Sequence, residues 1–256
     1  MGVRVGNEKR GLAFATCVSL LRPPLMLLTK RDWRGASNIP SEAGCVVVSN
    51  HISHFDPLAF AHFVYDAGRL PRFLAKAAVL ELPVVGRLIR ATGQIPVYRL
   101  TLDASKAFRA AVEAIERGQC VVVYPEGTIT RDPGLWPMTG KTGAARIALA
   151  TGCPVIPTAQ WGAQDVLAPY AKVPHLFPRK TMHVSAGPPV DLADLHGRPA
   201  TVDVLTLATD RIMDAVTDLL AQIRQEEPPA IRYDPRDHDR PAIGNPDKPG
   251  KQERRA

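Results

Sequence analysis

The stretch GCVVVSNHISHFDPLAFAHFV (residues 44–64) decides the fold of this chain. Residues 44–48 form a short, β-branched apolar run that predicts a buried strand, and residues 58–64 predict a helix. Between them lies a polar turn that carries two histidines and an aspartate. Such a turn falls at the carboxyl end of a strand, where α/β proteins bind their ligands. The stretch therefore predicts an α/β fold with a functional site at this turn.

His51 and Asp56 are the chemically important pair in the turn. Asp56 is predicted to be the N-cap of the following helix, with Pro57 at its first position. Two residues five apart on an ideal helix would diverge by about 140°, so a contact between His51 and Asp56 requires a non-helical turn. A carboxylate bonded to Nδ1–H leaves the Nε2 of the imidazole as a proton acceptor. We therefore predict that His51 is a general base oriented by Asp56.

Other interpretations of this turn need no catalysis. A histidine near a strand end is often a turn residue, and an Asp-Pro pair is a common helix start. His51, His54 and Asp56 also resemble the metal-binding motif of binuclear zinc hydrolases, but the spacing differs and the chain offers no second cluster. We expect no metal ion at this turn.

Composition limits the classes of protein to which the chain can belong. The chain has 256 residues, of which 45% are hydrophobic, enough for one sizeable domain with a soluble core. Its net charge of +7 suits anionic ligands or an anionic membrane surface. With 6% aromatic residues and no recognisable motif, a nucleic-acid partner is not expected. The cysteines lack paired spacing and are expected to be buried thiols in a reducing compartment.

Strand-like and helix-like segments alternate from residue 40 onward. Strands are expected at residues 72–75, 95–97, 120–124 and 154–159, with a possible edge strand at 182–185, and helices at 85–90, 102–117, 144–150 and 201–226. The run at 120–124 does not alternate, which is typical of a central parallel strand buried on both faces. We predict a single α/β domain over residues 35–227, with a central mixed, mostly parallel sheet flanked by helices.

The two ends of the chain differ from this domain. Residues 1–34 are expected to form an apolar, membrane-proximal helical segment, split by Arg22-Pro23-Pro24 into two short helices. Neither apolar run reaches the roughly 20 residues of a membrane span, and no signal-peptide cleavage site follows. The segment could pack on the core or lie in a membrane interface. Residues 228–256, rich in proline and charge, are expected to be disordered.

Two further polar clusters follow predicted strands. In residues 124–131, Gly127 permits a backbone turn close to a ligand. In residues 93–99, Arg99 lies on a short extended segment, and arginine suits bidentate binding of a phosphate. Taken alone, the first cluster could be an ordinary turn and the second a solvated arginine.

Together the three clusters resemble the motifs of the 1-acyl-sn-glycerol-3-phosphate acyltransferase family. The resemblance covers roughly residues 35–190. It consists of a His-x4-Asp motif at 50–56, a second motif at 93–99, a third at 124–128, a fourth at 155–157, and a Lys-x-Gly at 141–143. Where the family commonly has Arg-Ser after Glu-Gly-Thr, this chain has Ile129-Thr130, and its nearest arginine is Arg131. This departure leaves the acceptor lysolipid open.

The resemblance implies a reaction and a set of site residues. An acyl group from acyl-CoA or acyl carrier protein would pass to the free hydroxyl of a lysophospholipid, with 1-acyl-sn-glycerol 3-phosphate as the expected acceptor and phosphatidic acid as the product. His51 and Asp56 would be catalytic. The substrate-binding residues would be Arg99, Glu126, Gly127, Thr128, Asn50 and Ser53. Direct transfer needs no acyl-enzyme, so we expect Ser53 to be a turn or hydrogen-bonding residue and not a nucleophile.

The resemblance also implies partners and a location. No cofactor is expected beyond the acyl donor as co-substrate. The expected partners are the acyl donor, the lysophospholipid acceptor and an anionic membrane surface, with a peripheral or monotopic protein on the cytoplasmic face of the membrane. Two alternatives remain: an acyltransferase for another lysolipid or glycerol 3-phosphate, and a lipid-binding protein without catalysis.

Overall fold

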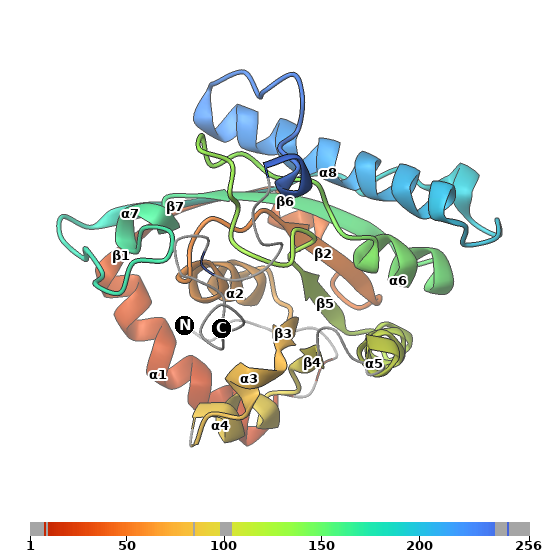
Figure 1. Ribbon diagram of the computed structural model, residues 1–256. Helices are drawn as coiled ribbons and strands as arrows, with labels where there is room; N and C mark the ends of the chain where they lie inside the picture. Colours follow the sequence, from red (N-terminus) through yellow and green to blue (C-terminus); the bar gives the residue numbers. More distant parts are fainter. Residues whose placement is uncertain (1–7, 9, 84, 98–103, 239–244, 246–256) are drawn as a thin grey trace, which may run out of the picture.

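One seven-stranded sheet organises the molecule, in the strand order β1-β7-β6-β2-β5-β3-β4 (Figure 1). The computed structural model describes residues 8, 10–83, 85–97, 104–238 and 245. The strands are β1 (Thr29–Arg34), β2 (Cys45–Ser49), β3 (Pro71–Lys76), β4 (Ile95–Val97), β5 (Cys120–Val123), β6 (Val155–Trp161) and β7 (Lys180–Ala186). Neighbouring strands are parallel except β6 and β7. The predicted mixed, mostly parallel sheet is therefore confirmed.

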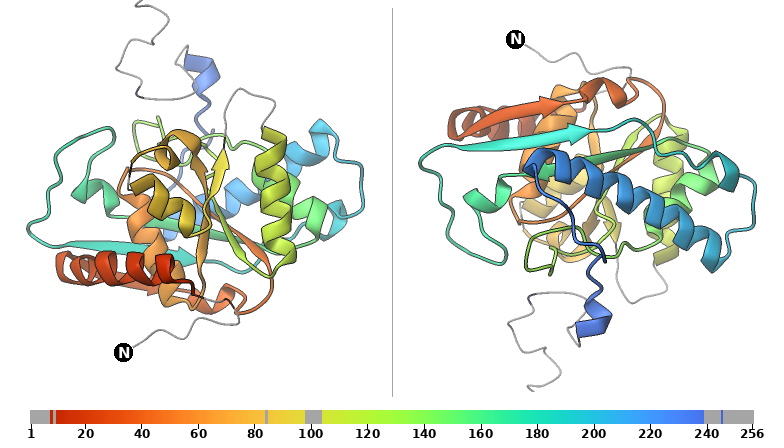
Figure 2. Two further views of the ribbon diagram at one scale, coloured as in Figure 1. Left: turned by 90° about the horizontal axis from the view of Figure 1, so that it is seen from below. Right: turned by 90° about the horizontal axis from the view of Figure 1, so that it is seen from above.

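Helices cover both faces of this sheet (Figures 1 and 2). They are α1 (Leu12–Leu28), α2 (Asp56–Asp66), α3 (Ala77–Leu80), α4 (Val85–Ala91), α5 (Ala104–Glu116), α6 (Gly143–Thr151), α7 (Ala163–Val166) and α8 (Val202–Arg224). In β2, Val46 and Val48 pack towards α5, α6 and α8, whereas Cys45 and Val47 pack towards α2. Both faces of β2 are thus buried, which explains its apolar run without alternation.

The N-terminal helix differs from the prediction. One helix, α1, continues through Pro23 and Pro24 where two short helices were expected. The two prolines lack the N–H groups that would bond the carbonyls of Ser19 and Leu20. Both of those residues are exposed, so water can satisfy their carbonyls. Within the part of the chain that the structure describes, no helix has the length and apolar character needed to cross a membrane.

The predicted boundary at residue 34 is also wrong. Residues Thr29–Arg34 form β1, which pairs in parallel with β7 and belongs to the sheet. β1 is an edge strand, and β7, predicted as a possible edge, lies between β1 and β6. The sequence TKRDWR did not predict a strand because its charged residues break the apolar pattern of a central strand, whereas an edge strand can carry such charges.

Part of the predicted disordered tail is ordered. The backbone N–H of Thr139 donates to the carbonyl of Tyr233 at 3.0 Å, and the guanidinium of Arg232 lies 2.5 Å from the carboxylate of Asp214 on α8. Residues 232 and 233 are therefore held against the domain. The remainder of the predicted tail, 239–244 and 246–256, lies outside the described residues.

Candidate active site

His51 and Asp56 meet in the turn after β2. Nδ1 of His51 lies 2.7 Å from Oδ2 of Asp56. The same carboxylate oxygen accepts the backbone N–H groups of Ile52 at 2.6 Å and Ser53 at 2.8 Å. Asp56 is fully buried, while the side chain of His51 is 15% exposed. The turn thus wraps around one carboxylate, and that carboxylate fixes the imidazole.

The helix start differs from the prediction in one detail. Phe55 is the N-cap of α2, and Asp56 is its first residue. The Asp56 carboxylate bonds backwards to the turn instead of forwards to its own helix, because the turn brings two amides and the imidazole to it. Asp56 therefore organises the turn and does not cap the helix.

A tyrosine supports the imidazole from one side. The ring of Tyr124, just after β5, stacks on His51 with centroids 4.4 Å apart and planes inclined by 19°. Burial raises the pKa of the Tyr124 hydroxyl well above its usual value, and the nearby charge of Asp56 raises it further. Nε2 of His51 makes no hydrogen bond among the described residues. The ring is held at Nδ1 and on one face, which leaves Nε2 for a substrate.

Glu126 is placed differently from the predicted substrate ligand. Its side chain is buried; Oε1 accepts the backbone N–H of His51 at 2.9 Å, and Oε2 accepts that of Met138 at 3.0 Å. Burial raises the pKa of Glu126 to about 8, although both hydrogen bonds oppose the shift. The carboxylate joins the loop after β5 to the catalytic turn, so its contacts are those of a structural bridge.

Asn50 and Ser53 are structural as well. The Asn50 amide donates to the carbonyl of Gln160 at 3.0 Å and accepts the Gln160 N–H at 2.8 Å. The Ser53 hydroxyl donates to the carbonyl of Leu167 at 2.6 Å and accepts the N–H of Phe55 at 3.0 Å. Both side chains are fully buried. They anchor the turn to β6 and to the loop beyond it, and neither is placed to contact a substrate.

In the third motif, Gly127 lies against the side chain of Lys141. Gly127 has φ of 68°, and a Cβ there would lie 2.9 Å from Nζ of Lys141. The backbone N–H of Lys141 donates to the carbonyl of Pro125 at 2.8 Å, which fixes this lysine to the motif. The Lys-x-Gly pattern was visible in the sequence, but no role for Lys141 followed from it. Thr128 is half-buried beside Gly127.

Two arginines bear on the predicted phosphate contact. Arg131, the nearest arginine to the third motif, is buried with 6% exposure. Arg99 lies outside the described residues, so its predicted contact with the acceptor phosphate stays a prediction.

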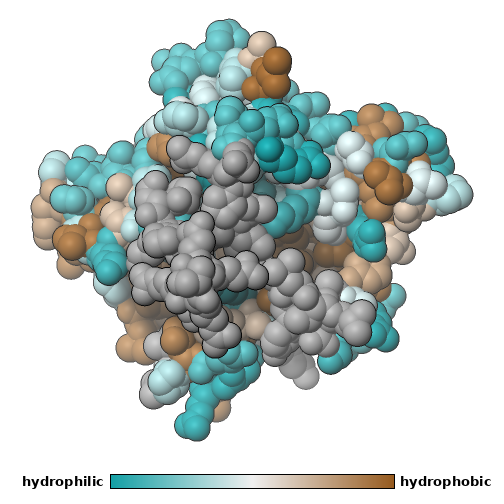
Figure 3. Space-filling model, viewed as in Figure 1, coloured by the Kyte–Doolittle hydropathy of each residue, from teal (hydrophilic) through white to brown (hydrophobic). Residues whose placement is uncertain are grey.

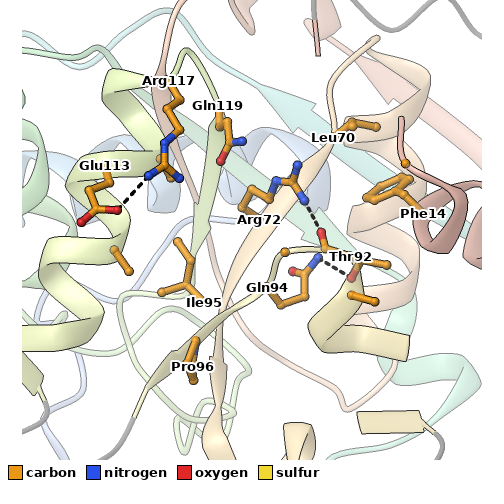
Figure 4. Close-up of a pocket in the computed structure, with 15 residues that line it drawn as sticks. Phe14, Leu70, Arg72, Thr92, Gln94, Ile95, Pro96, Glu113, Arg117 and Gln119 are labelled. Atoms are coloured by element: carbon orange, nitrogen blue, oxygen red, sulfur yellow. Dashed lines mark hydrogen bonds and ion pairs between the residues drawn. The ribbon is translucent and has the colours of Figure 1, made fainter. Parts of the chain in front are cut away.

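A cavity of about 440 Å³ opens at the other end of the sheet (Figure 4). It is lined by residues at the starts of β3 and β4 and by one side of α5, whereas His51 follows the end of β2. Figure 4 shows the guanidinium of Arg72 bonded to the carbonyl of Thr92, and Arg117 paired with Glu113. This cavity is therefore separate from the acid–base site.

Comparison with known proteins agrees with this arrangement. Residues 30–161 match the family model described as Acyltransferase. The chain belongs to the acyltransferase family. The matched residues include the His51–Asp56 turn and the Glu126 bridge, so the geometry above is that of an acyltransferase domain.

Two curated relatives carry a more specific name. The chloroplastic 1-acyl-sn-glycerol-3-phosphate acyltransferase of Brassica napus is 31% identical over 140 residues, which cover 54% of this acyltransferase chain and 39% of the relative. The 1-acyl-sn-glycerol-3-phosphate acyltransferase of Borreliella burgdorferi is 29% identical over 132 residues, 51% of each chain. The chain thus spans about half or less of the length of these relatives.

A solved structure supports the fold. The crystal structure of the 1-acyl-sn-glycerophosphate acyltransferase of Thermotoga maritima superposes with a TM-score of 0.64 at 23% identity, over 84% of this chain and 81% of that one. This likeness shows that the acyltransferase chain shares its α/β architecture.

Proposed function

We propose that the chain transfers an acyl group from acyl-CoA or acyl carrier protein to the free hydroxyl of a lysophospholipid. The acceptor that we propose is 1-acyl-sn-glycerol 3-phosphate, which would give phosphatidic acid. The observation that carries the proposal is the 2.7 Å contact between Nδ1 of His51 and a buried carboxylate that two backbone amides also hold. The names of the relatives in Brassica and Borreliella support the choice of acceptor.

The proposed mechanism is direct transfer with general base catalysis. Asp56 keeps the proton of the neutral imidazole on Nδ1, so Nε2 accepts the proton of the acceptor hydroxyl as its oxygen attacks the thioester carbonyl. The new C–O bond forms, the C–S bond breaks, and His51 returns the proton to the departing thiolate. No acyl-enzyme is formed, which agrees with the engaged Ser53 hydroxyl.

The head group of the acceptor needs a cationic partner. We propose Arg99 for the phosphate, from its position in the second motif, and Lys141 with Gly127 and Thr128 as a further part of the head-group site. Under this proposal Arg99→Ala raises the KM for the lysolipid more than the KM for the acyl donor. Arg99→Lys recovers only part of the loss, because lysine lacks the planar fork.

The acceptor also determines where the protein works. Lysophospholipids partition into bilayers, so we propose a peripheral or monotopic protein on the cytoplasmic face. Helix α1 supports this, because it contains no acidic residue and exposes Leu20 and Leu27.

A thiol-release assay tests the proposal. Acyl-CoA and acyl carrier protein are each supplied with lysophosphatidate, other lysophospholipids or glycerol 3-phosphate, and we expect the highest kcat/KM with lysophosphatidate. Preference for another acceptor would reassign the substrate. Acceptor-dependent release no faster in the wild type than in His51→Ala would support the non-catalytic lipid-binding alternative.

A further inference from the structure

We propose that the loop of residues 167–179, between α7 and β7, is a second membrane-contacting element that forms one surface with α1. The inference rests on the proposed function, since it concerns how the enzyme meets a lipid acceptor. The partner is an anionic bilayer surface. Nothing in the three sequence motifs pointed to this loop.

The loop exposes two bulky apolar side chains and partly buries a third. Val173 is 69% exposed and Phe177 is 75% exposed. Leu176, between them, packs inwards on a cluster that includes Val166 and Met182. The loop is thus anchored by one apolar residue and presents two others to its surroundings. A patch of neighbouring exposed apolar side chains is typical of an interaction surface.

Helix α1 supplies the neighbouring apolar residues. The guanidinium of Arg179, at the end of the loop, donates to the carbonyl of Met26 at 2.9 Å and to that of Thr29 at 2.7 Å. This contact fixes the end of the loop at the carboxyl end of α1. The apolar residues that α1 exposes are Leu12, Leu20, Leu21, Met26 and Leu27. In Figure 3, hydrophobic residues lie on the left side of the view, over the loop and α1.

The charges around this surface favour an anionic partner. The sequence has no aspartate or glutamate between Asp165 and Asp191. Lys172 in the loop, Lys180 at the start of β7 and Lys30 at the start of β1 make no ion pair within the described part of the chain. Two of the nearby acids are already paired, Asp32 with Arg34 and His183, and Asp66 with Arg22 and Arg31, which leaves Asp165 as one exposed acid before the loop. Apolar side chains rimmed by free lysines suit an anionic headgroup layer.

The other end of the loop reaches the catalytic turn. The carbonyl of Leu167 accepts the Ser53 hydroxyl at 2.6 Å. The ring of Tyr170 packs edge-on against His54, with centroids 5.8 Å apart, and its hydroxyl donates to the carbonyl of Ile129 at 3.4 Å. One loop therefore joins the proposed membrane surface to the first motif and to Ile129, directly after the third. Contact with the bilayer would hold His51 close to the layer that contains the acceptor.

The test places a charge on the loop and on matched sites elsewhere. The loop variant carries both Val173→Asp and Phe177→Asp. The controls carry Val202→Asp and Ile231→Asp, at residues that are 77% and 86% exposed on other parts of the fold. Each full-length variant is sedimented with vesicles of phosphatidylglycerol or of phosphatidylcholine. We expect the loop variant to lose on the order of tenfold in partition to phosphatidylglycerol, and the controls to match the wild type. All these residues are exposed, so equal thermal midpoints will confirm that the variants fold.

Activity gives the second readout. On acceptor embedded in vesicles, the loop variant should lose activity in parallel with its bound fraction, while activity on dispersed short-chain acceptor stays at the wild-type level. Unchanged sedimentation of the loop variant would overturn the proposal. A dimeric wild type that becomes monomeric on substitution, with vesicle binding unchanged, would instead make the patch a contact between two copies. If the wild type transfers no acyl group yet the loop variant still loses vesicle binding, only the proposed function fails.

Discussion

Two histidine–carboxylate pairs in this molecule have nearly the same geometry and very different surroundings. Nδ1 of His51 lies 2.7 Å from Asp56, and Nδ1 of His183 lies 2.9 Å from Asp32. In the first pair the carboxylate is fully buried and accepts two backbone amides. In the second, across β1 and β7, the side chains are 30–35% exposed and Arg34 bonds the same carboxylate. A short distance between the two groups therefore does not identify a catalytic pair.

The surroundings determine what each pair can do. Water screens the His183–Asp32 contact. Hydrogen bonds from Arg34 and, to a smaller extent, from His183 lower the pKa of Asp32, so the carboxylate interacts mainly with the arginine. In the turn after β2, no solvent competes for Asp56, and the stack on Tyr124 fixes the plane of the His51 ring. Only this pair follows the carboxyl end of a parallel strand. Burial and position, more than contact distance, separate the two pairs.

The largest expected effect comes from the histidines. His51→Ala should lower kcat by about 10²–10⁴-fold, the usual contribution of a general base, with a thermal midpoint near that of the wild type because the ring is partly exposed. His183→Ala should leave turnover within about twofold, as an exposed surface contact contributes little. Thiol release measures both. A large loss of turnover in His183→Ala, or no loss in His51→Ala, would show that the two pairs do not differ in catalytic role.

The carboxylates should differ in stability as well as activity. Asp56→Asn keeps one oxygen for Nδ1–H and the two amides, which all bond Oδ2, but it places a buried NH2 group where Oδ1 has no hydrogen-bond partner, and an unsatisfied buried group costs about 1–3 kcal/mol. Asp56→Asn should therefore lose most activity and unfold at lower urea concentration. Asp32→Asn, at the exposed pair, should change stability by about 0.5 kcal/mol or less. Equal shifts in the two urea midpoints would show that the burial of Asp56 does not increase its contribution to the free energy of unfolding.

Glu126 sharpens the comparison through pH, because it supports only the buried pair. The pKa of its carboxyl is raised from 4.5 to about 8 in the folded protein. Between these values the folded chain binds one proton more than the unfolded chain, so this contribution to stability is complete below about pH 4.5 and is lost as pH rises through about 8. We expect the thermal midpoint of the wild type to fall more steeply between pH 5.5 and 8.5 than that of Glu126→Gln. Parallel profiles would mean that Glu126 is ionised throughout.

The smallest effect concerns the ring behind His51. Tyr124→Leu removes a stack of about 0.5–1.5 kcal/mol, so kcat should fall roughly 2- to 12-fold. Tyr124→Phe keeps the stack and should retain more activity than the leucine variant. The comparison is made from kcat at saturating acceptor, with KM as the control for substrate binding. If phenylalanine costs more than leucine, the hydroxyl and not the ring positions the imidazole.

The sequence predicted what local patterns determine. The β-branched runs of β2 and β5 and the Asp56-Pro57 pair are local signals, and they located two buried strands and, to within one residue, the start of α2. The role of Glu126 could not be predicted in this way, because its partner His51 is 75 residues away along the chain. Asn50 bonds to Gln160 across 110 residues, so its amide looked as available to a substrate as to the fold. β1 was missed because its charges suit an edge strand, whose apolar pattern is weak.

The pairing of β1 with β7 has a consequence for biosynthesis. Asp32 and His183 face each other in this register although 151 residues separate them along the chain. A nascent chain emerges from its N-terminus, so α1 and β1 leave the ribosome long before the strand that receives them has been made. During that interval α1 lacks the 167–179 loop, whose Arg179 bonds the carboxyl end of the helix in the folded domain. The helix can then meet a bilayer before the domain closes, so attachment to the membrane could precede folding.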